Sequence, residues 1–263
     1  MSTAIADLLR HGRLQDAVAA ATAAVRAAPV AALPRVLLAE LLLLAGDLPR
    51  ADTALDAAVA LDASFAPGIA EFRQLLRAET ARRQVLQEGR MPEFLGEPEP
   101  HQAQALAALV ASHDKDAAGA TMATEAAEAA RPRCPGEHDG VAFNDIRDAD
   151  DVLAGTLEVL TTTGKLFWVS FARIERIAFE PPRRPRDLAW RHAALTVRGG
   201  PDGVVYIPSL YDPQSDDTDA HRLGQMTTWS EGPGPVRGRG QRLLVLGEDA
   251  KGVLELTELT WPA

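Results

Sequence analysis

The chain has 263 residues, of which 46% are hydrophobic, so it is long enough for about two domains and too apolar to be disordered as a whole. Its formal net charge is −10, from 27 basic and 37 acidic residues. This balance argues against nucleic acid or an anionic membrane as the main partner, because binding phosphate groups requires a positive field.

The first residues contain no basic stretch followed by an apolar one, so no signal peptide is expected there. The most apolar run, residues 36–45, is interrupted by Glu40 and is too short to cross a bilayer. The single cysteine, Cys134, can form no disulfide within the chain and has no neighbours at metal-ligand spacing. We therefore expect a protein of the reducing cytoplasm that is not embedded in a membrane.

Residues 1–90 are rich in alanine and leucine, which favour helices, and they contain a repeat. The segment GRLQDA at Gly12 recurs as GDLPRA at Gly46, 34 residues later, and this offset is the period of the tetratricopeptide (TPR) repeat. Glycine permits the tight turn between paired helices. The repeat predicts a TPR-like stack in which residues 33–45 form the first helix of the second unit. A long helix over residues 67–87 is expected to cap it.

Residues 91–135 are expected to form a linker and connecting helices, because the proline-rich stretch 91–100 is followed by helical patterns at 101–113 and 117–130. Residues 136–263 contain short apolar runs between glycines and prolines, which predict strands. The expected fold is multidomain, α and α+β. A TPR-like α-α superhelix is followed by a strand-rich α+β domain with a small antiparallel sheet or barrel. Strands are expected at residues 152–160, 165–170, 174–180, 193–198, 203–207, 224–229, 241–246 and 252–259.

No local motif for catalysis, for a metal or for a cofactor is present, so we expect a protein that is not an enzyme and needs no cofactor. The six histidines are scattered, and the glycine-rich stretch 232–238 does not have the spacing of a dinucleotide-binding loop. An enzyme or small-ligand-binding protein remains the alternative. Its site would be assembled from distant residues such as Asp187, His192, His221 and Arg222.

Charged residues gather in four places. The acidic clusters at 148–151 and 212–219 are expected to be solvated loops, the first alternatively a helix N-cap. The second lacks the glycine and glutamate of a calcium-binding loop. Arginines at 183–186 and 237–242 could bind phosphate or carboxylate, but exposed loops are the simpler interpretation. A secondary docking site is nevertheless considered at Arg186, Asp187 and Trp190, with Trp190 as an anchor or a core residue and Asp187 as a cap.

The helix predicted at residues 33–45 is apolar on more than one face. Leu38, Ala39 and Leu42 are expected to face the packed interior. The surplus apolar surface predicts a concave groove for an amphipathic helix, with an acidic residue that selects a basic neighbour. Alternatively, the third repeat or the C-terminal domain covers this surface. The residues expected in the groove are Val36, Glu40, Leu43 and Leu44.

An ordered series of segments resembles the ImpE family, also called TagJ or SciE-type proteins. The segments are residues 41–47, 139–150, 165–177, 179–182, 185–191, 205–211 and 222–224 with Trp229. This resemblance implies an accessory protein of a bacterial type VI secretion cluster, with a TPR-like region, an α+β domain and no catalytic residues. It also implies two partners. One is the small sheath subunit, bound through its N-terminal helix, and the other is the ClpV-type AAA+ ATPase that recycles the contracted sheath.

Overall fold

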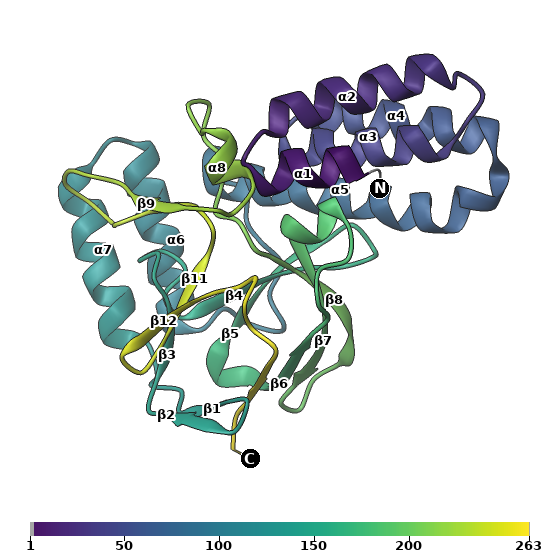
Figure 1. The fold of residues 1–263 in the computed structure, drawn as a ribbon. Helices are drawn as coiled ribbons and strands as arrows, with labels where there is room; N and C mark the ends of the chain where they lie inside the picture. The colour runs from purple at the N-terminus through teal and green to yellow at the C-terminus, as the bar shows by residue number, and fades with distance from the viewer. Residues whose placement is uncertain (1–2, 263) are drawn as a thin grey trace.

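The computed structural model describes residues 3–262. Its N-terminal part is a stack of five helices, in which each helix packs against the next along the chain (Figure 1). The stack confirms the TPR-like region that the repeat predicts. Its helices are α1 (Thr3–Arg10), α2 (Leu14–Ala27), α3 (Leu33–Leu44), α4 (Leu48–Leu61) and α5 (Ala66–Glu88), with the short helix η1 (Ala63–Phe65) before α5.

The two repeat glycines make the turns that the sequence predicts. Gly12 ends α1 with a φ of +68°, and Gly46 ends α3 with a φ of +86°. Both lie in the left-handed region, which glycine enters at little cost. At Gly46 an added Cβ would also lie 2.7 Å from Nη1 of Arg222, so the end of that side chain would have to move. That nitrogen donates a hydrogen bond of 2.6 Å to the carbonyl oxygen of Ala45.

Replacing Gly46 by alanine should therefore lower the free energy of unfolding by about 1–3 kcal/mol, from the strained φ and the displacement of Arg222. Gly68→Ala is the matched control, because Gly68 lies inside α5 and an added Cβ would meet nothing within 4 Å. That substitution should be neutral or stabilising. Urea denaturation of both variants measures the difference, and equal stabilities would contradict this account of the turn.

The residues that follow α5 lie against the edge of a sheet. The backbone of Glu93 pairs with the edge of a strand, since its N–H donates to Leu166 and its carbonyl accepts from Trp168. Two further helices, α6 (Pro100–His113) and α7 (Ala117–Ala130), form a hairpin beside the strand-rich part (Figure 1). Both helices lie where their sequence pattern places them. The division of the chain at residues 90 and 135 stays a prediction.

The C-terminal part is built on an antiparallel sheet of eight strands in the order β2-β1-β13-β6-β7-β8-β4-β5, accompanied by small sheets of three and two strands. This confirms the predicted strand-rich domain. Within the described residues, β2 and β5 are the two edge strands of the main sheet. The strands are β1 (Gly136–His138), β2 (Val141–Phe143), β3 (Ile146–Asp148), β4 (Thr156–Leu160), β5 (Leu166–Ser170), β6 (Ile174–Phe179), β7 (Trp190–Val197), β8 (Asp202–Pro208), β9 (Thr227–Trp229), β10 (Gly238–Gly240), β11 (Leu243–Leu246), β12 (Asp249–Gly252) and β13 (Glu258–Thr260). Between them lie η2 (Phe171–Arg173), η3 (Pro185–Leu188) and α8 (Asp219–Arg222).

Three of the predicted strands differ from the structure, and of the run at 224–229 only Thr227–Trp229 is extended. The run at 252–259 is not one strand, because β12 ends at Gly252 and Val253 and Leu256 fill the core from a turn before β13 begins. The run at 152–160 forms a strand only from Thr156, since the carboxylate of Asp150 accepts the N–H groups of Val152 and Leu153 and holds the preceding residues in a turn. In the last two cases an apolar run is buried without being extended.

The helical and strand-rich parts share one hydrophobic core. Leucines of α3 and α5 pack in the same cluster as Trp168, Trp190 and Tyr206, which project from one face of the sheet. The opposite face carries a second core that includes Ile174, Ile177 and Leu259. The helical stack is therefore fixed to the sheet by a continuous apolar contact.

Candidate docking groove

The apolar face of α3 that the sequence singles out is only half open. Leu43 and Leu44 are 4% and 3% exposed, and they border the same small space as Trp190 and Leu210 of the strand-rich part. The prediction that these two leucines face an open concave surface is wrong. The C-terminal part covers them, as the alternative interpretation held, because this end of α3 belongs to the core that joins the two parts.

The other half of the same face lines an open groove. A cavity of about 720 Å³ lies between α2, α3, α5 and the loop at residues 183–186. Val36 and Glu40 contribute to it, as predicted, together with Leu33 and Leu37. These four residues follow the i, i+3, i+4, i+7 spacing of a helix face, so the sequence contained the signal for Leu33 and Leu37. The opposite wall is also apolar and is formed by Phe65, Ile69 and Phe72.

Glu40 is the polar exception in this apolar surface. Its side chain is buried, and it accepts no hydrogen bond in the part of the chain that the structure describes. Among the described residues, the nearest cationic atom is Nε of Arg184, 3.8 Å from Oε1 of Glu40, which is beyond hydrogen-bonding distance. Burial raises the pKa of Glu40 to about 7, although Arg184 and Arg186 act in the opposite direction. Glu40 therefore titrates near neutral pH in the free protein.

Arg186 closes one end of the groove and is firmly held. Its Nη2 donates to Oε1 of Glu71 at 2.9 Å, and the hydroxyl of Tyr206 donates to the same oxygen at 2.6 Å. The guanidinium lies over the rings of Phe72 and Tyr206, with 5.0 and 5.8 Å to their centroids. Burial alone would raise the pKa of Glu71, but Tyr206 and Arg186 outweigh it and hold this pKa below its ordinary value. Arg186 and Glu71 thus form a fixed ion pair at the groove.

Comparison with known proteins places the chain in a family. Its fold is similar to that of protein VPA1032 from Vibrio parahaemolyticus, solved by X-ray crystallography, with a TM-score of 0.92 and 26% identity over 99% of this chain and 98% of that one. The family model described as ImpE protein matches residues 140–260. The "Type VI secretion system accessory component TagJ" of Pseudomonas aeruginosa is 34% identical over 254 residues, which are 96% of this chain and 89% of that protein. The chain belongs to the ImpE/TagJ family.

The resemblance found in the sequence is thus confirmed for this ImpE/TagJ-family protein. None of the helices within residues 3–262 is both long and apolar enough to cross a membrane.

The two other residues of the predicted secondary docking site have structural roles. Oδ2 of Asp187 accepts the backbone N–H groups of Arg183 and Arg184, at 2.8 and 3.1 Å, and so shapes the loop that borders the groove. Trp190 is buried, where it packs edge-on against Phe72 and donates from Nε1 to Glu79 at 3.2 Å. Trp190 is a core residue in this family member and not an exposed anchor.

The four residues of the enzyme alternative do not meet in one place. Asp187 and His192 line a cavity of about 610 Å³ beside Tyr206. His221 and Arg222 lie on α8, border a different cavity, and are engaged with Thr228 and with the carbonyl oxygen of Ala45. Within residues 3–262, no three histidine, cysteine or acidic side chains are grouped as metal ligands.

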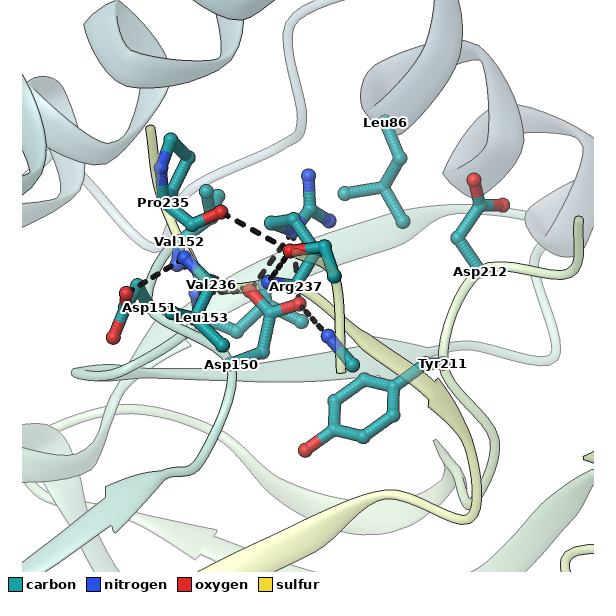
Figure 2. A network of polar contacts seen from close by, with 12 residues as sticks. Leu86, Asp150, Asp151, Val152, Leu153, Tyr211, Asp212, Pro235, Val236 and Arg237 are labelled. Carbon is teal, nitrogen blue, oxygen red and sulfur yellow. Dashed lines mark hydrogen bonds and ion pairs between the residues drawn. The ribbon is translucent and has the colours of Figure 1, made fainter. Parts of the chain in front are cut away.

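The acidic and basic clusters of the sequence largely neutralise each other. Figure 2 shows the carboxylate of Asp150 between Arg237, whose Nε donates at 2.8 Å, and the backbone N–H groups of the following turn. In the same way Arg242 pairs with Asp148, and Arg239 with Asp217 at 2.7 Å. The expectation of solvated loops is wrong for Asp148, Asp150, Asp212 and Arg242, which are buried. These arginines are therefore not a free site for phosphate.

Proposed function

We propose that this ImpE/TagJ-family protein is a non-catalytic accessory component of a type VI secretion apparatus that acts in the cytoplasm. Its groove would hold the N-terminal helix of the small sheath subunit, and the protein would link that subunit to the ClpV-type AAA+ ATPase. The name of the P. aeruginosa relative supports the association with this apparatus. The family resemblance in the sequence supports the two partners.

The open apolar groove between α3 and α5 carries the docking proposal. Helix-in-groove recognition buries one apolar face of an amphipathic helix against side chains that are already held in place. Here one wall is a helical stripe of α3, and the other is formed by Phe65 and Ile69. Because the wall residues are fixed by the shared core behind them, little conformational entropy is lost when a helix binds.

The proposal predicts that Val36→Glu weakens binding of the small sheath subunit at least 30-fold, because a carboxylate would be buried against an apolar helix. Val36 lines the groove but is only half-buried, so the fold should be retained. Calorimetric titration with the subunit encoded in the same cluster, and with a peptide of its N-terminal helix, measures the loss. Circular dichroism checks the fold.

Met122→Glu is the matched control, since Met122 is exposed on α7 and does not border the groove. It should bind as the unmodified chain does. If Val36→Glu and Met122→Glu bind the peptide equally well, the groove is not the docking site. A small molecule that co-purifies with the chain and is released by Val36→Glu would mean that the groove holds a small ligand and not a helix, and the cavity has a suitable volume for one.

A further inference from the structure

Three carboxylates lie beside the groove, and they differ in how well they are held by neighbouring donors. Glu40 on α3, Glu71 on α5 and Asp187 on η3 face Arg184 and Arg186 of the same loop. Arg186 is committed to Glu71 at 2.9 Å. Within residues 3–262, Arg184 is shared by the other two carboxylates, and its Nε lies 3.8 Å from Glu40 and 3.5 Å from Asp187. The neighbouring Arg183 pairs with Glu180. The positive charge of the chain's amino terminus also favours the charged form of Glu40.

Of the three carboxylates, Glu40 is the one that no described residue holds by a hydrogen bond. Asp187 accepts two backbone N–H groups, and Glu71 accepts from both Tyr206 and Arg186. Within residues 3–262, Glu40 accepts no such hydrogen bond, although only 4% of its surface is exposed. A buried carboxylate without a hydrogen-bond donor is costly, and a docked helix that excluded the remaining water would increase the cost. A bound helix must therefore bring a donor to this point or bind less tightly.

Resting on the proposed docking function, we propose that Glu40 receives a lysine or arginine side chain from within the apolar face of the bound helix, and that this contact releases a proton from Glu40. The step is balanced, because the neutral carboxyl loses its proton to solvent and the resulting carboxylate pairs with the incoming cation. The recognised segment is then an amphipathic helix with one basic residue inside its apolar stripe.

The direction of the pH dependence follows from burial. The charged form of Glu40 binds, and in the free protein its pKa is raised to about 7. A cation at Glu40 lowers this pKa in the complex. Affinity is therefore full above pH 7 and is lost as the pH falls through 7, by about tenfold between pH 8 and pH 6. At pH 7 about half a proton should be released per complex formed.

The test is a calorimetric titration of the full chain with a synthetic peptide of the small sheath subunit's N-terminal helix. It is run at pH 6, 7 and 8, and at pH 7 in two buffers of different ionisation enthalpy. The unmodified chain should show the tenfold change and the proton release, and Glu40→Gln should show neither. Replacing one basic residue of the peptide by norleucine should also remove both. Asp56→Asn, at an exposed carboxylate outside the groove, should behave as the unmodified chain.

The outcomes separate the two proposals. Peptide binding that Val36→Glu abolishes but that does not vary with pH would keep the docking function and overturn the role of Glu40. Proton uptake with stronger binding at low pH would overturn it as well, because it would mean that the helix brings an acidic residue to Arg184. No binding at any pH would overturn both. As a readout without ligand, the carboxyl ¹³C resonance of Glu40 should titrate near pH 7, and titration near pH 4.5 would contradict the inference.

Discussion

Leu43→Asp is expected to lower the free energy of unfolding by more than about 4 kcal/mol, because it places a carboxylate in the core that joins α3 to the strand-rich part. A protein of this size has about 5–15 kcal/mol of stability in total, so the variant should be largely unfolded or insoluble. If it can be purified, its melting temperature should fall by about 10 °C or more. If Leu43 instead faced an open groove, as the sequence predicts, the substitution would abolish partner binding and leave the circular dichroism spectrum unchanged.

Leu33→Asp is the matched control for this prediction. It makes the same chemical change on the same face of α3, three turns earlier, but Leu33 is 64% exposed at the mouth of the groove. Its effect on stability should be within about 0.5 kcal/mol, as for other surface positions. Thermal unfolding of the two variants measures the difference between their stabilities. If Leu43→Asp is as stable as Leu33→Asp, the C-terminal part does not cover α3 in solution.

The helices could be predicted because their signals are local. The glycine repeat at Gly12 and Gly46 fixes two turns, and α3 begins at the residue where the sequence pattern places it. The strands β1 and β2 were missed for the opposite reason. Each has three residues, too few for a clear alternation, and β1 pairs with β13, more than a hundred residues later.

The groove shows the same limit of sequence reasoning. The helical stripe from Leu33 to Leu44 predicts correctly which face of α3 is apolar. It cannot tell which part of that face another segment covers. Here the boundary is set by Trp190, which lies more than a hundred residues away and packs on the C-terminal half of the stripe. The ion pairs of Asp148 with Arg242 and of Asp150 with Arg237 were hidden for the same reason, because each cluster reads as solvated when its distant partner is unknown.

A buried group of charges links α5 to the sheet. Substituting its central arginine is expected to lower the free energy of unfolding strongly. Arg82 is 2% exposed, and its Nε donates to Oε2 of Glu158 on β4 at 2.9 Å. Its Nη2 donates to the carbonyl oxygen of Leu210 at 3.0 Å, and Arg242 approaches the same oxygen of Glu158 at 3.3 Å. Burial disfavours the charge of Arg82, but Glu158 and Glu79 outweigh it and hold the pKa of Arg82 above its ordinary value. The guanidinium is thus charged throughout the accessible pH range.

Arg82→Met should therefore lower the free energy of unfolding by about 3–5 kcal/mol, because it leaves part of the charge of Glu158 buried and uncompensated and one backbone carbonyl without its donor. Arg73→Met is the control on the same helix. Arg73 also bridges two carboxylates, those of Asp52 and Asp56, but its side chain is 34% exposed, so its loss should cost about 0–1 kcal/mol. Urea denaturation at pH 7 compares the two. Because α5 and the sheet share one core, the loss at Arg82 should appear as a single earlier transition of the whole chain, and a separate early transition of the helices alone would contradict that coupling.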